Sequence, residues 1–382
     1  MAQTLLQLTE AGLYCAAGDF YIDPWRGVPR AVVTHAHSDH ARWGSQKYLA
    51  SRESEWVLRA RLGEIQLETV PYGQPVLLNG VRVSLHPAGH IVGSAQVRVE
   101  YKGEVWVVTG DYKIEADPTC TPFELVRCHS FVTESTFGLP IYRWQPQQRV
   151  FDEMNAWWRA NAAAGKASMV FGYALGKAQR IQAGLDPSIG PIYAHGAVMR
   201  MNEAYERTRT HLNTTDTLDT HDTSSHTSDT SPIRALPEVV YAGSDTDVKR
   251  KRGETFAGAL IVAPPSAAAS PWLRRFGDLS TAFVSGWMRI RGARRRRSVD
   301  RGFVLSDHAD WPGLTETILN TGAERVWVTH GYTAVLARWA EGQGLEAATL
   351  QTRFEGDEEE ETEQPGSRDD GRGTADDHPT PL

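Results

Sequence analysis

The chain has very little cysteine and no long apolar run. Its three cysteines, Cys15, Cys120 and Cys128, are too few for a disulfide scaffold, and none forms a C-x-x-C pair that would bind zinc through thiolates. We therefore expect buried thiols and a metal site, if any, made of histidine and carboxylate. No stretch approaches the roughly 18 apolar residues of a membrane span, and no secretion signal opens the sequence. These absences predict a protein without membrane segments, located in the cytoplasm.

A strong excess of charge is also missing from most of the sequence. The formal net charge is -7, but residues 355–382 alone hold eleven acids and two arginines, which leaves +2 on residues 1–354. A weakly basic body is compatible with a polyanionic substrate but does not identify one. The acidic tail at 355–382 predicts disorder.

Two kinds of pattern divide the chain. The first 135 residues alternate short apolar runs with turn residues, which predicts strands at 20–22, 31–34, 81–85, 95–99 and 105–109, with a helix at 53–61. From 141 to 285 the pattern indicates an α/β domain, with helices at 147–164 and 177–183 around a strand at 168–171. Strands resume at 303–305 and 325–329.

A segment rich in Thr, Asp and Ser at 208–231 has almost nothing apolar to bury, so we expect a disordered insert there. Its histidines, His211, His221 and His226, are interpreted as ordinary loop residues rather than metal ligands.

Four side chains of the metal-binding type follow the expected strand at 31–34, in Thr34-His35-Ala36-His37-Ser38-Asp39-His40. Residues two apart in an extended segment face the same side, so His35 and His37 can bind one ion. Asp39 and His40 then turn toward a second. Because zinc usually takes about four N or O ligands, other segments must contribute.

Three further candidates border apolar strands and sit beside glycine: His90 in Gly89-His90, Asp111 in Gly110-Asp111, and His330 in His330-Gly331. A lone histidine at a strand end is usually a hydrogen-bonded structural residue, which is our interpretation of His86, His129 and His195. The density of ligand types at 35–40, with three more such positions, favours a metal centre instead.

These motifs resemble the metallo-β-lactamase superfamily, and the later ones resemble its nucleic-acid-processing branch, the β-CASP nucleases. The later matches are Glu134 in Val132-Thr133-Glu134-Ser135-Thr136-Phe137-Gly138, His308 in Leu305-Ser306-Asp307-His308-Ala309-Asp310, and the His330-Gly331 turn. Residues 171–179, 263–266 and 286–289 look most like the bacterial ligase-associated DNA exonucleases, a group similar to mRNA 3′-end processing factors. The resemblance covers residues 5–350 and fails in the Thr/Asp-rich insert and the tail.

The resemblance implies an α/β fold, a metallo-β-lactamase αββα sandwich with an inserted α/β cap domain of the β-CASP type. It places the first part of the sandwich at 1–140, the cap at 141–285, the second part at 286–354 and the disordered tail at 355–382.

The resemblance also implies two divalent metal ions. His35, His37 and His90 would hold one ion and Asp39, His40 and His330 the other, with Asp111 bridging. Zinc is the expected metal, and the oxygen-rich second site could take manganese. Asp23 aligns with an aspartate that orients ligands, although an ordinary turn aspartate before proline remains an alternative.

The chemistry implied is attack on phosphorus by a hydroxide that both ions activate, in a site that includes Asp39. His308 would donate a proton to the leaving sugar oxygen, oriented by Glu134. Alternatively, His308 only hydrogen-bonds a phosphate oxygen.

Seven arginines lie in the fourteen residues from Met288 to Arg301. Such runs are usually solvated faces, but the position just before His308 favours phosphate binding. The expected contacts are Arg289, Arg291, Arg294, Arg295, Arg296 and Arg297, extended by Lys177, Arg180 and the backbone N–H groups of the turn at 172–176.

The function expected from these features is a metal-dependent DNA exonuclease of repair or end processing, whose family resemblance suggests partnership with a DNA ligase and a helicase. A β-CASP ribonuclease of RNA processing is the alternative. A small-molecule hydrolase would share residues 35–40 but would not need the arginines or the cap. A non-enzymatic nucleic-acid scaffold is disfavoured by the intact ligand set.

Overall fold

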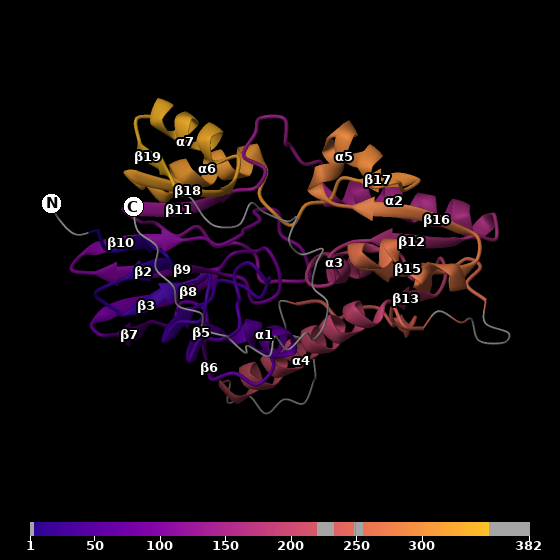
Figure 1. Cartoon of the computed structure of the whole chain (residues 1–382), viewed down its shortest axis with the longest axis horizontal. Coiled ribbons are helices and arrows are strands. Elements are labelled where there is room, and N and C mark those ends of the chain that lie inside the picture. Colours follow the sequence, from indigo (N-terminus) through magenta and orange to yellow (C-terminus); the bar gives the residue numbers. More distant parts are fainter. Residues whose placement is uncertain (1–3, 220–232, 248, 250–254, 351–382) are drawn as a thin grey trace, which may run out of the picture.

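The computed structural model describes residues 4–219, 233–247, 249 and 255–350, whose strands form three sheets (Figure 1). The expected mixed α/β class is confirmed. Two sheets lie face to face, and the third stands beside them in a separate unit (Figure 1).

The first sheet comprises six strands in chain order, antiparallel from β1 to β3 and parallel from β3 to β6: β1 (Gln7–Thr9), β2 (Gly12–Cys15), β3 (Phe20–Ile22), β4 (Arg30–Val32), β5 (Lys47–Ser51) and β6 (Leu67–Val70). The second has seven, in the order β19 (Glu346–Thr349), β18 (Arg325–Gly331), β11 (Ser130–Ser135), β10 (Glu104–Val108), β9 (Ala95–Tyr101), β8 (Val81–Pro87) and β7 (Val76–Leu78).

A shared apolar core holds these two sheets together. It includes Phe20 and Val32 from the first sheet and Leu85, Val97 and Trp106 from the second, all nearly inaccessible to solvent. Alternation of apolar and polar residues along β8 and β9 directs one face of each strand inward. Burial of these side chains provides the main stabilisation of the pair of sheets.

Helices cover both outer faces of this pair (Figure 1). The short helix η1 (Arg52–Ser54), α1 (Glu55–Leu62) and α4 (Gly196–Asp219) pack on the first sheet, where Val57 and Leu58 meet Met201 and Tyr205. On the second sheet lie α6 (Trp311–Thr321) and α7 (Thr333–Gly342).

The third sheet is entirely parallel and forms an inserted domain, defined here as residues 147–303. Its order is β14 (Val240–Tyr241), β13 (Ile192–Ala194), β15 (Leu260–Ala263), β12 (Ala167–Phe171), β16 (Leu279–Val284) and β17 (Arg301–Phe303). Its helices are α2 (Gln147–Ala163), α3 (Lys177–Gly184), α4, α5 (Arg291–Arg296), η2 (Pro265–Ala269), η3 (Pro271–Phe276) and η4 (Gly286–Arg289). Buried Trp158 and Trp272 belong to the cores on its two sides.

Two sequence expectations are wrong in this domain. The helix α4 continues through Asp219, so residues 208–219 are not disordered. Thr208 donates to the carbonyl of Glu53 at 3.2 Å, and Leu212 is buried against the first sheet, which supplies the apolar contact that composition concealed. Residues 220–231, with His221 and His226, lie outside the described residues, as does the tail at 355–382.

The boundary expected after residue 285 is also wrong. Strand β17 pairs with β16 through Phe283 and Gly302, so residues 286–303 belong to the inserted domain. The expected strand at 303–305 therefore begins and ends earlier, at Arg301–Phe303.

All three cysteines are buried, as expected. Among the described residues, no helix combines the length and the apolar character that crossing a bilayer demands.

The end of β18 approaches β11 so closely that only glycine fits at one position. His330 and Gly331 both have left-handed backbone angles, with φ of 53° and 76°. A Cβ at Gly331 would lie 2.4 Å from the carbonyl oxygen of Ser135. This turn sets the direction of the His330 ring.

Replacing Gly331 with alanine is expected to lower the free energy of unfolding by about 2–5 kcal/mol, because the side chain adds left-handed strain to a backbone clash. Urea denaturation of the metal-free protein measures the change. Gly342→Ala is the matched control: a Cβ there meets nothing within 4 Å, so that variant should be neutral or slightly more stable. Equal stability of the two variants would contradict the close approach.

Candidate metal centre

The carboxyl ends of several strands meet at one edge of the paired sheets and bring together the residues that the motifs indicated. Residues 35–40 follow β4, His90 follows β8, and Asp111 follows β10. Glu134 lies near the end of β11 and His330 near the end of β18, while His308 comes from the segment between β17 and α6. Since β8, β10, β11 and β18 run in the same direction, their ends share an edge.

One nitrogen of His35 has its hydrogen-bond role fixed by its neighbours. The Thr34 hydroxyl donates to Asp23 Oδ2 at 2.6 Å, so it can only accept from His35 Nδ1, which lies 3.1 Å away. The remaining nitrogen, His35 Nε2, then carries a lone pair.

His37 and His90 are fixed in the same way by backbone carbonyls. His37 Nε2 donates to the carbonyl of Leu175 at 3.3 Å, and His90 Nδ1 donates to that of Asp307 at 2.7 Å. The other nitrogen of each ring bears a lone pair.

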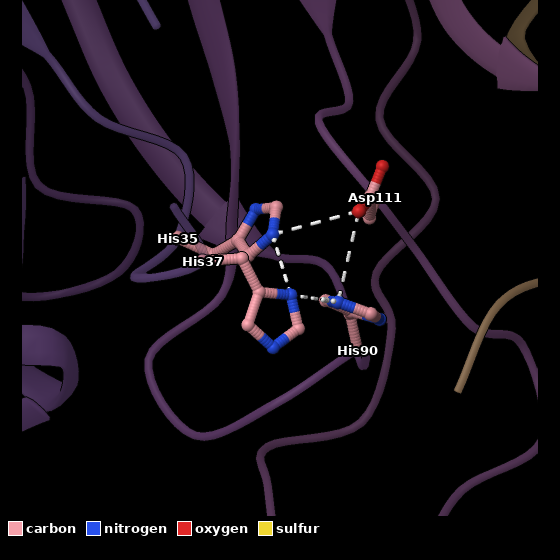
Figure 2. A group of neighbouring side chains, drawn as sticks. All are labelled: His35, His37, His90 and Asp111. Atoms are coloured by element: carbon pink, nitrogen blue, oxygen red, sulfur yellow. Dashed lines mark hydrogen bonds and ion pairs between the residues drawn. The ribbon is translucent and has the colours of Figure 1, made fainter. Parts of the chain in front are cut away.

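These three lone pairs converge. His37 Nδ1 lies 3.1 Å from both His35 Nε2 and His90 Nε2. Asp111 Oδ2 lies 3.5 Å from His35 Nε2 and 3.8 Å from His90 Nε2 (Figure 2). Four electron-rich atoms therefore face one another in a buried space, an arrangement that a cation at their centre stabilises.

A second group of ligand-type atoms adjoins the first and shares Asp111. His40 Nδ1 donates to Asp23 Oδ2 at 2.7 Å, which directs Nε2 toward Asp39 at 3.4 Å and Asp111 at 3.6 Å. The ring of His330 is 5.1 Å from that of His40, centre to centre. Its side chain, with His40 and Asp111, offers ligand atoms within 4.8 Å of one another.

Burial and charge tune these groups for metal binding. Burial lowers the pKa of His37 and of His330 to about 4, and lowers the pKa of His35 and His90 well below the usual value, so these rings are neutral at physiological pH. Neutral imidazole is the metal-binding form.

The carboxylate side of the cluster attracts positive charge. Burial lowers the pKa of His40, but the carboxylates of Asp39, Asp111 and Asp23 raise it to a net value near 10. Burial also raises the pKa of Asp111. Both shifts mean that this space favours a proton or another cation.

The donor set fits divalent metal ions. His40 Nε2 and Asp111 Oδ1 are buried atoms without a hydrogen-bond partner among the described residues. Both residues belong to the groups of possible metal ligands, so the cluster could bind metal ions. A cavity of about 60 Å³ opens on this side, lined by Asp39, His40, Asp111, Glu134 and His330 among others.

Beside the cluster, Glu134 holds His308 in place. Its two carboxylate oxygens lie 3.1 and 3.0 Å from His308 Nδ1, which donates to them. Glu134 also accepts from the backbone N–H of Tyr112 at 2.8 Å, so its own orientation is fixed. A larger cavity of about 370 Å³ lies beside His308, with Lys113 and Trp144 in its wall.

Sequence reasoning missed several neighbours of these residues. The carbonyls of Leu175 and Asp307 orient two of the histidines but carry no sequence signal, because every residue has a carbonyl. An aromatic cluster packs around His308, with Phe137 5.8 Å from its ring. Its other members are Tyr142, Trp144, Trp287 and Tyr332.

Lys177 and Arg180 do not have the exposure expected of phosphate contacts. Both are almost fully buried and both pair with Asp307, at 2.8 Å in each case. The expectation that they extend a phosphate track is wrong, because burial and ion pairing commit their charges within the protein.

The arginine run lies in η4 and α5 of the inserted domain. Arg289, Arg291 and Arg295 are exposed, whereas Arg297 is half-buried with its guanidinium 4.4 Å from the centre of the Phe283 ring. The side chains of Arg294 and Arg296 lie outside those that the structure describes.

The histidines interpreted as structural do lie outside the cluster. His86 pairs with Glu124 at 3.1 Å, His129 Nδ1 accepts from the N–H of Val105 at 3.0 Å, and His195 lies 3.4 Å from Asp245. His211 lies in α4.

No family model matches the chain. It is 30% identical over 340 residues to a protein named probable DNA ligase from Opitutus terrae, a match that covers 88% of this chain and 30% of that protein. It is also 30% identical over 123 residues to the proteins named endoribonuclease YSH1 from Eremothecium gossypii and Saccharomyces cerevisiae, covering 32% of this chain and 16% of each of them.

Among solved structures, a protein of unknown function from Enterococcus faecalis aligns with a TM-score of 0.52 at 11% identity, over 85% of this chain and 79% of that one. This likeness concerns the fold alone. The chain spans less than a third of the length of the curated relatives it matches. Together the sequence matches support a relationship to the nucleases of the metallo-β-lactamase and β-CASP type.

Proposed function

We propose that this protein is a metal-dependent nuclease that hydrolyses phosphodiester bonds in DNA, acting as an exonuclease in repair or end processing. The observation that carries the proposal is the cluster of seven His and Asp side chains that form overlapping groups of possible metal ligands, with Asp111 shared between the groups of His35, His37 and His90 and of His40 and His330. On this proposal the paired sheets are the metallo-β-lactamase sandwich, and residues 147–303 are its β-CASP-type cap.

The ligand sets proposed are His35, His37 and His90 for one ion and Asp39, His40 and His330 for the other, with Asp111 between them. When bound, two such ions would activate a water molecule and neutralise charge on the phosphate. Zinc suits the histidine-rich set, and manganese is a candidate for the set with more oxygen.

The protein's own contribution to bond cleavage centres on His308. The Glu134 carboxylate accepts from Nδ1 and so fixes the ring, and in this proposal His308 donates a proton to the leaving sugar oxygen. Asp23 keeps His40 oriented through a bond of 2.7 Å.

Ribonuclease activity is the second candidate, favoured by the matches to proteins named endoribonuclease. The DNA proposal takes support from the match to the protein named probable DNA ligase, which covers far more of this chain. This chain aligns with 30% of the length of that protein, which is named a ligase. From this match we infer that nuclease and ligase act on the same DNA ends. A helicase is a further proposed partner.

The first test incubates end-labelled single-stranded DNA, double-stranded DNA and matching RNA with the protein and added zinc or manganese. We expect DNA to be shortened from a labelled end and the double variant Asp39→Ala/His40→Ala to be inactive. Preferential RNA cleavage would replace the DNA proposal with the ribonuclease, and inactivity on all three substrates would overturn both.

Replacing His308 with alanine is expected to slow DNA cleavage by about 10²–10⁴-fold, because it removes the proposed proton donor. A nucleotide p-nitrophenyl ester, whose leaving group departs without a proton, should be affected much less. His129→Asn, a change at an exposed histidine that precedes β11 and so lies at the opposite end of that strand from Glu134, serves as the control. Equal effects on both substrates would instead assign His308 to binding a phosphate oxygen.

The exposed arginines of η4 and α5 are proposed to bind the DNA backbone. Changing Arg289, Arg291 and Arg295 together to glutamine should weaken binding and reduce the slope of log K against log salt. The expected reduction is about 0.7–0.9 for each phosphate group that the variant no longer neutralises. Fluorescence anisotropy at several salt concentrations measures the slope.

A control of equal charge changes Arg82, Arg127 and Arg338 to glutamine, three exposed arginines of the paired sheets and their helices. Its slope should stay close to that of the unchanged protein. If both triple variants reduce the slope equally, net charge rather than the arginine run governs binding.

A further inference from the structure

The inserted domain reaches into the metal cluster through one short segment, the turn at 172–176 and the start of α3. Gly176 has a φ of 85°, and a Cβ there would lie 2.2 Å from Ile91 Cγ2 and 4.0 Å from His37 Nε2. Gln179 Oε1 accepts from the N–H of Gly176 at 2.7 Å, which fixes the turn to the helix. The turn is therefore held against the loop that carries His90.

This segment orients His37 directly. The carbonyl of Leu175 accepts from His37 Nε2, and this bond leaves Nδ1 as the atom that faces the other ligands. A change in the position of α3 would move that acceptor.

The same segment orients His90 through Asp307. Lys177 Nζ lies 2.8 Å from Asp307 Oδ2 and donates to the carbonyl of Leu305 at 2.8 Å, while Arg180 lies 2.8 Å from Asp307 Oδ1. The backbone carbonyl of Asp307 accepts from His90 Nδ1. The two cations of α3 thus hold the peptide that fixes the His90 ring.

This ion-pair cluster is closed to solvent: Lys177, Arg180 and Asp307 are 3%, 2% and 5% exposed. Arg180 also lies 3.5 Å from Asp117, which in turn pairs with Lys113 at 2.7 Å. Asp307 is therefore bound on both carboxylate oxygens, which makes the contact rigid.

The other group of ligands depends on different partners. His40 is oriented by Asp23 and lies 3.4 Å from Thr34, both from the first sheet and the loops at its edge. The turn that directs His330 packs on Ser135 at the end of β11. None of the hydrogen bonds described for His40 or His330 comes from α3.

We propose that the α3 latch, defined as Leu175, Lys177, Arg180 and Asp307, positions the ligands of one metal site only, the site of His35, His37 and His90. This inference rests on the proposed two-metal function. These latch residues are positioning residues, since they act through His37 and His90. Loss of such outer partners typically weakens metal affinity by about 10–100-fold.

The test titrates metal-free protein with Co²⁺ and follows both stoichiometry and the visible spectrum, which reports ligand geometry without any substrate. Lys177→Met is expected to weaken the affinity for one of the two Co²⁺ ions by about 10–100-fold and to leave the affinity for the other unchanged. Lys166→Met is the matched control: Lys166 forms an exposed ion pair with Asp278 at 3.5 Å in the same domain, and its loss should alter neither ion.

Two backgrounds identify the affected site. In His330→Ala the remaining site is that of His35, His37 and His90, and adding Lys177→Met should weaken it. In His37→Ala the remaining site is that of Asp39, His40 and His330, and the same change should have no effect.

Fewer than two Co²⁺ ions on the unchanged protein would refute the two-metal function itself. Two ions on the unchanged protein, with both sites or neither weakened by Lys177→Met, would overturn the latch alone. If Lys177→Met does not fold, Arg180→Lys gives the same comparison, because it keeps the charge but shortens the reach to Asp307. Lys177→Arg should restore the affinity.

Discussion

The constraint on which this structure depends is the convergence of unprotonated imidazole nitrogens at 3.1 Å beside the Asp111 carboxylate. Lone pairs at that distance repel one another, so the surrounding fold must fix each ring from behind. It does so with the Thr34 hydroxyl and the carbonyls of Leu175 and Asp307. A bound cation would turn this repulsion into attraction.

The order of elements along the chain follows from this constraint. The inserted domain leaves the paired sheets after β11 and returns before α6, and both points lie beside the cluster. The connection back passes through Asp307 and His308, which places an orienting carbonyl and the Glu134-bound imidazole on adjacent residues. Helix α4 then crosses from the inserted domain to α1 and packs there (Figure 1). The two units are therefore joined by buried contacts on both sides of the cluster.

Local patterns in the sequence predicted much of this arrangement, because ligand spacing and strand alternation are local properties. The strand at 20–22 and the helix that starts at Gln147 lie where expected. Partners distant in sequence were not predictable. Lys177 and Arg180 look like phosphate contacts in the sequence, because the sequence gives the charge of a residue but not its burial. Likewise, the Thr-rich end of α4 looks disordered until α1 supplies its packing partner, and β17 is assigned to its sheet only by pairing with β16.

Choice between DNA and RNA cannot come from the metal cluster, since the scissile phosphate is chemically the same in both. The arginine contacts proposed for η4 and α5 would not distinguish them either, because guanidinium groups bind the phosphate backbone that both share. The 2′-hydroxyl is the group that differs, and a protein senses it only where side chains meet the sugar. In the proposed nuclease, Lys113 and Trp144, in the wall of the cavity of about 370 Å³ beside His308, would be candidates for such contacts.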